Sequence, residues 1–334
     1  MSQEDSAMPR LIHIFPALLI AALLWVLWVL WRSPLQPEAW EPPPNPGLHG
    51  AFASNARLAA SSGLLPNVGL GPEDVARGPD GALYTGFEDG RIVRFDSAGH
   101  RVYAHTGGRP LGMQFDADGK LIVADAVRGL LSISADGEVS VLADSFEDAP
   151  LKFVDDLDIA EDGTIWFSDA SRRYGLEDAL SDLLEASATG RLLSYTPATG
   201  EVKAHLGGLY FANGVALGPR DRFVLVNETG AGRILRLWLK GERAGQSEVF
   251  AEGLPGYVDN LSFNGRDTFW VALPGLRDPL LEATASMPWL RKLIAELPDS
   301  VLLPPEGGIG FVLGFGVDGT LLHNLQDPDG SYHT

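Results

Sequence analysis

The sequence contains no cysteine, and this absence excludes both disulfide bridges and thiolate metal sites. Basic residues are also scarce, because 25 lysines and arginines stand against 44 aspartates and glutamates, for a formal net charge of −19. A surface that binds nucleic acid needs positive charge, so the composition argues against DNA or RNA as a partner. An acidic surface is compatible with bound cations, although solubility alone accounts for it at least as well.

One long apolar segment stands near the N-terminus. Residues 11–31 contain no aspartate, glutamate, lysine or arginine, and about 20 apolar residues span the core of a bilayer. Trp25, Trp28 and Trp31 lie near the distal end, where aromatic side chains favour the membrane interface. The alternative is a cleavable signal peptide, but its apolar region is shorter and a small-residue cleavage site follows it. We therefore predict an uncleaved transmembrane anchor after a tail at residues 1–10.

The flanking charges do not orient this segment, because Arg10 and Arg32 balance across it. Residues 32–49 are rich in proline, which predicts an extended, semi-rigid spacer between the anchor and the following domain. A calcium site of the extracellular kind fills only at about 10⁻⁴–10⁻³ M. If such a site is present, we expect the domain to face the periplasm or the cell exterior.

A short pattern recurs along the rest of the chain: an apolar strand, a turn of Asp-Gly type and a second strand, which is typical of β-hairpins. The six copies cover residues 73–86, 111–125, 155–169, 213–227, 259–272 and 311–324. Their starts are 38 to 58 residues apart, and a four-stranded propeller blade needs about 40–50 residues. We therefore predict an all-β fold, a six-bladed β-propeller over residues 50–334. A β-sandwich does not explain the regular recurrence.

The sixth copy is followed by few residues before Thr334. We expect either an open last blade or a chain that is a fragment, and an open blade would leave exposed strand edges.

Equivalent positions in the six copies should converge at one level of the propeller axis, because the first strand of each blade lines the central channel. These positions hold Glu73, Leu111, Asp155, Asn213, Asp259 and Phe311. Four of the six carry carboxylate or amide oxygens, and Asp74, Asp156 and Asn260 follow directly after three of these four.

Carboxylates crowded on an axis repel one another unless a cation lies between them. Ligands with oxygen alone indicate a hard ion, and Ca²⁺ accepts six to eight such oxygens. Asp259 and Asn260 open a predicted strand, where both residue types are disfavoured, and we interpret them as two ligands of an axial metal. The competing interpretation is that aspartate and asparagine at strand ends cap turns.

Several motifs also carry a family resemblance. The segments PEDVARGPDG, FVDDLDIA, FANGVAL and VDNLSF resemble the calcium-dependent propellers of the paraoxonase and gluconolactonase group. The segments GKLIVADAVRGLLSI and FVLVNETGAGRILRLWLKG resemble the strictosidine-synthase-like branch, which includes the adipocyte plasma membrane-associated proteins. The resemblance extends from about residue 70 to about residue 330, in the order and spacing of the motifs.

The resemblance implies a catalytic calcium ion and a set of ligands for it. The residues that match the ligand positions are Glu73, Asp155, Asn213, Asp259 and Asn260. It also implies a possible second calcium ion held by Asp74 and Asp156. In two places the chain departs from the paraoxonase pattern, because Asp155 stands where those enzymes usually have asparagine, and Leu111 replaces a histidine proposed as part of their base.

Two segments, at residues 175–187 and 276–297, interrupt the regular recurrence of the hairpin pattern. Their apolar spacing predicts amphipathic helices. Such helices form either a lid over the mouth of the channel, in contact with the bilayer, or a rim packed on the propeller. Arg172, Arg173 and Tyr174 precede the first segment and face either the substrate or the blade surface.

Together these features predict a membrane-anchored, calcium-dependent hydrolase of lactones or aryl esters. The calcium ion would polarise the carbonyl group, and Asp259, or another axial carboxylate such as Glu73 or Asp155, would activate water. A non-catalytic binding propeller with structural calcium is the main alternative. A metal-free condensing enzyme of the strictosidine synthase type fits less well, because the chain retains the asparagine and Asp-Asn ligands.

Overall fold

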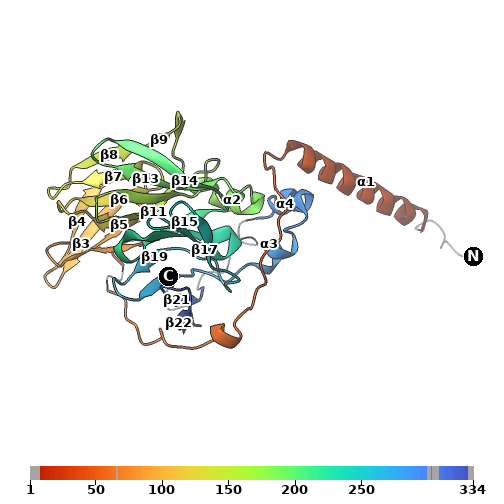
Figure 1. Ribbon diagram of the computed structural model, residues 1–334. Coiled ribbons are helices and arrows are strands. Elements are labelled where there is room, and N and C mark those ends of the chain that lie inside the picture. Colours follow the sequence, from red (N-terminus) through yellow and green to blue (C-terminus); the bar gives the residue numbers. More distant parts are fainter. Residues whose placement is uncertain (1–7, 65–66, 299–301, 303–307, 330–334) are drawn as a thin grey trace, which may run out of the picture.

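The computed structural model describes residues 8–64, 67–298, 302 and 308–329. Five four-stranded sheets make up its main body, and each sheet is an antiparallel meander with its strands in chain order (Figure 1). Most of the predicted tail at residues 1–10 and the chain end at Thr334 lie outside the described residues.

The first sheet contains β1 (Val75–Arg77), β2 (Leu83–Gly86), β3 (Arg91–Asp96) and β4 (Gly99–His105), and the second contains β5 (Pro110–Phe115), β6 (Leu121–Asp125), β7 (Gly129–Ile133) and β8 (Val139–Ala143). The third contains β11 (Val154–Ile159), β12 (Ile165–Asp169), β13 (Gly190–Thr196) and β14 (Glu201–Leu209). The fourth contains β15 (Ala212–Leu217), β16 (Phe223–Glu228), β17 (Arg233–Trp238) and β18 (Ser247–Ala251). The fifth contains β19 (Leu261–Phe263), β20 (Thr268–Ala272), β21 (Gly310–Gly316) and β22 (Leu321–Asp327). A hairpin of β9 (Ser145–Phe146) and β10 (Ala149–Pro150) connects the second and third sheets.

The helices lie outside the sheets. Helix α1 (Met8–Arg32) precedes them, α2 (Ala179–Glu185) interrupts the third sheet, and α3 (Pro279–Ala283) and α4 (Pro288–Ile294) interrupt the fifth. Both predicted helical insertions therefore contain helices. Short 3-10 turns complete the described elements: η1 (Gly50–Phe52), η2 (Leu176–Asp178), η3 (Pro219–Asp221) and η4 (Thr229–Ala231).

The five sheets form a β-propeller. The first strands of successive sheets contact one another in chain order, from β1 through β5, β11 and β15 to β19. Buried apolar side chains fill the space between neighbouring sheets, as where Val154 and Phe167 of the third sheet pack against Ile122 and Leu130 of the second. The predicted propeller architecture is therefore confirmed.

The predicted number of six blades is wrong for the described part of the chain, which forms five four-stranded sheets. The copy at residues 311–324 does not begin a sixth blade, because β21 pairs with β20 and, with β22, completes the fifth sheet. Phe311 is fully buried in the apolar core beside Phe269 and does not lie at the axis. The two hairpins of one blade share the same strand-turn-strand pattern, so a local pattern does not distinguish the inner hairpin from the outer one.

The turns follow the expected Asp-Gly chemistry. Gly81, Gly163 and Gly319 adopt positive φ angles of 81°, 84° and 89°, a region that glycine enters without steric cost. The preceding aspartates accept a backbone N–H two residues further on, for example from Thr164 to Asp162 at 2.9 Å. These turns place the two strands of each hairpin in register.

Polar side chains on or next to the inner strands connect neighbouring blades. Backbone N–H groups of the second, third and fourth blades donate to side chains of the blade before them. The pairs are Met113 N to Asp74 Oδ2 at 2.8 Å, Ile159 N to Gln114 Oε1 at 2.9 Å and Val215 N to Asp156 Oδ2 at 2.8 Å. These bonds satisfy backbone donors that the sheets leave free near the axis, where an unpaired buried group would be costly.

Helix α1 covers the segment predicted as an anchor. Its described side chains are largely exposed, and Trp31 retains 82% of its accessible surface. Within the part of the chain that the structure describes, no helix combines the length and the hydropathy needed to cross a membrane. The helix is therefore established, whereas its role as a transmembrane anchor is not confirmed.

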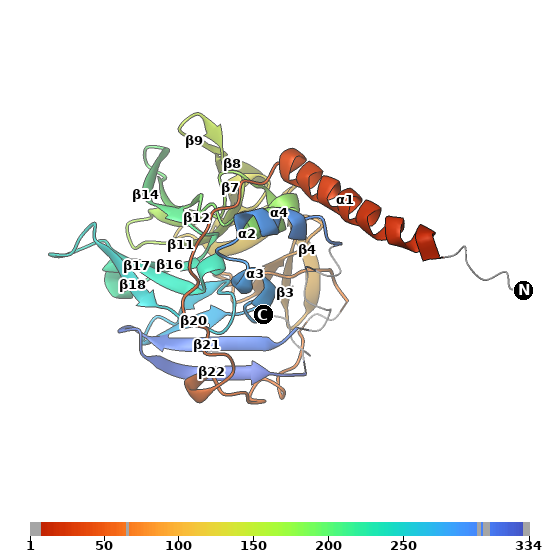
Figure 2. The ribbon, with the colours of Figure 1, turned by 90° about the vertical axis from the view of Figure 1, so that its right-hand side faces the viewer.

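Residues 34–47, which we call the strap, lie within the predicted linker and are docked on the protein. Figure 2 shows this segment running past the helices, and we call α2, α3 and α4 together the cap. The Glu38 N–H donates to the carbonyl of Glu185 in α2 at 2.8 Å, and the Trp40 N–H donates to the carbonyl of Ala285 after α3 at 3.2 Å. Leu35 is buried against Leu184 and other apolar side chains of the cap.

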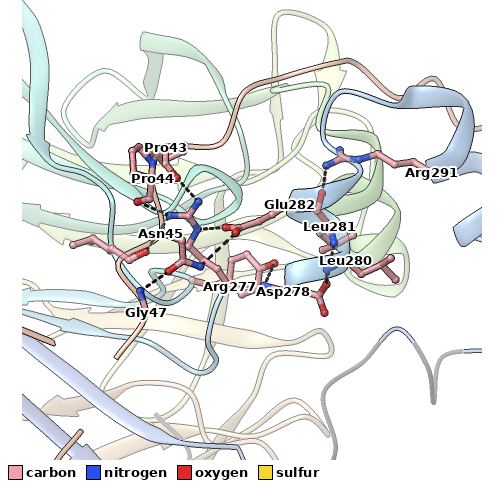
Figure 3. Close-up of polar contacts among 12 residues, drawn as sticks. Pro43, Pro44, Asn45, Gly47, Arg277, Asp278, Leu280, Leu281, Glu282 and Arg291 are labelled. Atoms are coloured by element: carbon pink, nitrogen blue, oxygen red, sulfur yellow. Dashed lines mark hydrogen bonds and ion pairs between the residues drawn. The ribbon is translucent and has the colours of Figure 1, made fainter. Parts of the chain in front are cut away.

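Arg277 holds the middle of the strap (Figure 3). Its guanidinium donates to the carbonyl of Pro43 at 2.6 Å and to that of Pro44 at 3.4 Å, and it pairs with Glu282 of α3. Asn45 of the strap also donates to Glu282, at 3.4 Å. Only 5% of Arg277 is exposed, so the strap closes over its charge.

Replacing Arg277 by alanine should release the strap. Glu282 and two strap carbonyls lose their partner, and breaking a buried ion pair typically costs about 3–5 kcal/mol. We expect limited proteolysis to cut within residues 33–48 much faster in Arg277→Ala than in the parent chain. Arg243→Ala, which removes an exposed arginine paired with Glu248, is the control and should leave the digestion pattern unchanged. Equal cutting rates in the Arg277→Ala variant and the parent chain would contradict a docked strap.

Candidate functional site

The structure brings together the five residues predicted as ligands, which we call the axial site: Glu73, Asp155, Asn213, Asp259 and Asn260. Asp155 and Asn213 lie near the starts of β11 and β15, and the other three lie one or two residues before β1 or β19. The Asn213 amide donates to Asp259 Oδ1 at 2.7 Å, and the Asn260 amide donates to the carbonyl oxygen of Glu73 at 3.3 Å. These bonds join the fourth blade to the fifth and the fifth to the first.

Burial and mutual repulsion govern the charges of the axial acids. Burial, together with the negative charge of Asp259, raises the pKa of Glu73 to about 7, while Arg109 opposes the rise. Burial also raises the pKa of Asp259 to about 6, against the hydrogen bond from Asn213. The pKa of Asp155 rises well above its ordinary value through burial and the charges of Asp259 and Glu73. A cation among these groups would lower all three values.

Two amide oxygens of the axial site have no partner. Asn213 Oδ1 and Asn260 Oδ1 are buried and accept no hydrogen bond, a situation that costs about 1–3 kcal/mol for each buried acceptor. Both amide nitrogens are already used as donors. Unpartnered carbonyl-type oxygens beside carboxylates are the donor set that a hard cation such as Ca²⁺ prefers. The chemical type of these donors therefore fits such an ion.

The acids themselves are not gathered as a finished metal cage. Among the described residues, no three acidic, histidine or cysteine side chains lie in a group that could hold a metal ion. Glu73 is turned toward Arg109, whose Nη2 lies 3.0 Å from Glu73 Oε2. A cation at the axis would therefore have to draw Glu73 away from this arginine.

The two residues predicted for a second metal act as connectors between blades. Asp74 accepts from its neighbour Val75 N at 2.6 Å as well as from the second blade, and Asp156 likewise accepts from Leu157 N at 2.8 Å and from Val215 N. Each carboxylate oxygen thus already holds one N–H donor. Both side chains border a central cavity of about 490 Å³, which the inner strands of all five blades line. A second metal ion remains a prediction.

An apolar layer lies above the axial site. Leu111, which replaces a histidine in the paraoxonase pattern, is buried with Phe153 and Phe211, and the rings of these two pack edge to face. Ala186, which follows α2, and Trp40 of the strap pack against the same layer. The cap and the strap thus cover this apolar layer. A lid over the mouth of the channel remains a prediction.

Arg173 and Tyr174 hold the cap in place. Arg173 forms an ion pair of 3.1 Å with the buried Glu185 of α2, and the hydroxyl of Tyr174 donates to the same carboxylate. Arg173 also donates to the carbonyl of Pro34 at 3.0 Å, which links the strap to the same group. Arg172 is exposed on the surface. The first two residues are thus bound to the cap, and Arg172 lies on the blade surface.

Sequence reasoning missed a set of acids at the ends of the second strands. Asp125, Asp169 and Glu228 accept the backbone N–H groups of Arg109, Phe153 and Tyr210, at 3.0, 3.1 and 2.9 Å. In each case the donor lies just before the first strand of a blade, and the acceptor ends the second strand of the same blade. The signal was present, because an acid ends the copies at residues 111–125 and 155–169 and directly follows the copy at residues 213–227.

Solved structures share this propeller fold. A gluconolactonase of Xanthomonas campestris aligns with a TM-score of 0.58 at 18% identity, over 78% of this chain and 77% of that chain. Regucalcin of Agrobacterium tumefaciens, a calcium-binding protein, aligns with a TM-score of 0.55 at 17% identity, over 77% and 74%. At such low identity the likeness shows the fold alone.

Sequence comparisons give the family. The strictosidine synthase family model matches residues 155–242, and the strictosidine synthase-like N-terminal model matches residues 50–95. The adipocyte plasma membrane-associated protein of Danio rerio is 35% identical over 94% of this chain and 81% of its own length. Strictosidine synthase-like protein 7 of Arabidopsis thaliana is 36% identical over 78% and 73%. The chain therefore belongs to the family of adipocyte plasma membrane-associated and strictosidine synthase-like proteins.

The cap contains a buried acid whose removal should stabilise the protein. Burial, with the charge of Glu185 adding to it, raises the pKa of Asp182 in α2 from 3.8 to about 6. A raised pKa in the folded state favours the protonated carboxyl. Its contribution to stability is therefore full below about pH 4 and is lost as the pH rises through 6. The loss amounts to about 3 kcal/mol at most.

Asp182→Asn should therefore raise the free energy of unfolding at pH 7.5, by up to about 3 kcal/mol, and should change it little at pH 4. Denaturant unfolding at the two pH values measures this difference. Glu177→Gln replaces an exposed acid beside the same helix and should have no effect at either pH. A variant that is no more stable than the parent chain at pH 7.5 would refute the prediction.

Proposed function

We propose that the protein is a calcium-dependent hydrolase of lactones or aryl esters, with its reaction centre at the axial site. The observation that carries this proposal is the pair of buried, unpartnered amide oxygens of Asn213 and Asn260 beside one buried carboxylate, Asp155, and two partly buried ones, Glu73 and Asp259. Polar groups buried in this way cost free energy unless a cation or a polar ligand compensates them.

Glu73, Asp155, Asn213, Asp259 and Asn260 are the residues that would hold Ca²⁺. When bound there, such an ion supplies a Lewis acid that polarises a carbonyl oxygen. Asp259 would accept the proton from water, because the hydrogen bond from Asn213 fixes one of its oxygens. Leu111 leaves the site without a histidine at this position, so the base is an acidic side chain.

Structural neighbours support the class of reaction. The gluconolactonase of Xanthomonas campestris is named for lactone hydrolysis, and regucalcin of Agrobacterium tumefaciens is described as calcium-binding. Both properties are proposals for this chain. The apolar layer of Leu111, Phe153 and Phe211 suits an uncharged lactone or aryl ester better than a strongly polar sugar acid.

A second function, a binding propeller with a structural cation, is favoured by one observation. The cap and Trp40 cover the apolar layer above the axial site, which leaves a substrate no direct path unless the cap moves. Turnover separates the two functions, because a binding propeller binds Ca²⁺ without hydrolysing any lactone or phenyl ester.

Asp259→Asn should reduce calcium-dependent turnover by about 10²–10⁴-fold, the usual contribution of a general base. The side chain keeps its shape but loses its charge, so calcium binding should also weaken. Hydrolysis of simple lactones and phenyl acetate is to be followed with and without a chelator, beside calorimetric titration with Ca²⁺. Asp267→Asn, at an exposed acid in the turn before β20, is the matched control. Turnover that persists in chelator, or an unimpaired Asp259→Asn variant, would disprove the proposal.

We also propose that α1 attaches the protein to a membrane, with the propeller on the side that faces away from the cytosol. Relatives are named plasma membrane-associated proteins, and residues 11–31 carry no charged side chain. An open oxygen site of the extracellular kind binds calcium at about 10⁻⁴–10⁻³ M, a concentration that the cytosol does not reach.

Removal of residues 1–31 should shift the protein from the membrane fraction to the soluble fraction and leave its melting temperature unchanged. This truncation keeps the strap, whereas removal of residues 1–47 deletes it and should also lower the melting temperature. Sedimentation after alkaline extraction, together with thermal unfolding, tests both truncations. A full-length chain that is already soluble would overturn the anchor, and protection of the propeller from protease in intact cells would overturn its orientation.

A further inference from the structure

Arg109 is a buried cation beside the axial site. It directly precedes β5, and only 8% of its surface is exposed. Its Nη2 lies 3.0 Å from Glu73 Oε2, and its Nη1 donates to the carbonyl of Gly71 at 2.7 Å. One side chain thus connects the second blade to the chain that enters the first.

The fold determines where this guanidinium lies. The backbone N–H of Arg109 donates to Oδ1 of Asp125, a fully buried carboxylate that ends β6. The same oxygen accepts the N–H groups of Val127 and Arg128, at 3.0 and 2.9 Å. Three backbone donors on one buried oxygen fix the entry to β5, so Arg109 is held toward the axis by the blade itself.

The charge of Arg109 acts on more than its direct partner. It lowers the pKa values of both Glu73 and Asp155, against the burial that raises them. Two axial carboxylates, those of Glu73 and Asp155, thus share one buried guanidinium as a counter-charge. A bound divalent cation would take over this role, and it would be repelled by an arginine that remained close.

We propose that Arg109 is an internal counter-ion that competes with the divalent cation for Glu73 and so sets the cation affinity of the axial site. This inference rests on the proposed function only in so far as the axial site binds a cation. Without the cation, the ion pair between Glu73 and Arg109 offsets part of the repulsion among the buried acids. On binding, the cation draws Glu73 from the guanidinium, and the loss of that pair weakens the net affinity. Arg109 acts through Glu73 and is therefore a positioning residue.

The test is calorimetric titration of the full chain with CaCl₂ at pH 8.5, above the pKa of about 7 of Glu73. Arg109→Met removes the charge but keeps an apolar stem, and it should bind Ca²⁺ about tenfold or more tightly than the parent chain. Arg109→Lys keeps the charge and should stay within about threefold of the parent chain. Arg191→Met is the matched control, because it breaks another buried arginine–carboxylate pair, with Asp169, and should not alter calcium affinity.

A double-mutant cycle with Glu73→Gln tests the route of the effect. If Arg109 acts through Glu73, Arg109→Met should no longer tighten binding when Glu73 is neutral. If Arg109→Met does not fold, as judged by circular dichroism, Arg109→Gln takes its place in the cycle. Unchanged or weaker binding in the folded, charge-free variant overturns the inference, and so does an effect that persists in the Glu73→Gln background.

Failure of the inference and failure of the proposed function are distinguishable. A parent chain that binds no Ca²⁺ at millimolar concentration refutes the calcium site, and the inference falls with it. A parent chain that binds Ca²⁺ with an affinity that Arg109→Met does not change refutes the inference alone. Binding of Ca²⁺ that tightens in Arg109→Met without any ester or lactone turnover supports the counter-ion role and refutes the hydrolase.

Discussion

Burial of carboxylates and amides where the inner strands begin is the constraint on which the rest of this structure depends. Successive blades meet at the axis through side-chain oxygens that accept backbone or amide N–H groups, as Asp74, Asp156 and Asp259 do. The same residues that join the blades therefore also concentrate negative charge. The binding of an ion at the axis would therefore be coupled to stability, because the groups that hold the blades together are those that a cation would compensate.

The groups around the axial site either compensate this negative charge or enclose it. Arg109 provides the buried positive charge, and an apolar layer around Leu111 and Phe153 packs against the cap and the strap. Lower dielectric strengthens both the repulsion among the acids and their attraction for a cation. The helices of the cap complete this enclosure, and Glu185, at the end of α2, binds Arg173 and Tyr174 from the neighbouring loop.

Much of the fold and of the axial site was predictable from the sequence, because both depend on local patterns that repeat. Asp-Gly turns mark the hairpins, and Asp259 and Asn260 stand out at a strand start where such residues are disfavoured. Alignment of the copies then brought Glu73, Asp155 and Asn213 to the same level, where the structure also places them.

Features that depend on pairing between distant segments were not predictable in this way. The copy that begins at Phe311 has the local pattern of an inner hairpin, and only its pairing with β20 reveals an outer one. Arg109 left no repeated signal, because the equivalent positions of other copies hold residues such as Gly71 and Phe153. The proline-rich composition of residues 34–47 predicted a spacer instead of the docked strap. The residue that binds the strap, Arg277, lies more than 200 residues further along the chain, and no local pattern indicates this contact.

Because the strap is docked, α1 is mechanically coupled to the propeller instead of being joined to it by a flexible linker. A flexible linker would let the propeller rotate freely and would absorb any pull on α1. Here the chain leaves α1, meets α4 through the Arg32–Glu296 pair, and continues along α2 and α3 as the strap. A torque on α1 would therefore be transmitted to the cap helices, and a surface that held α1 would also fix the orientation of the propeller.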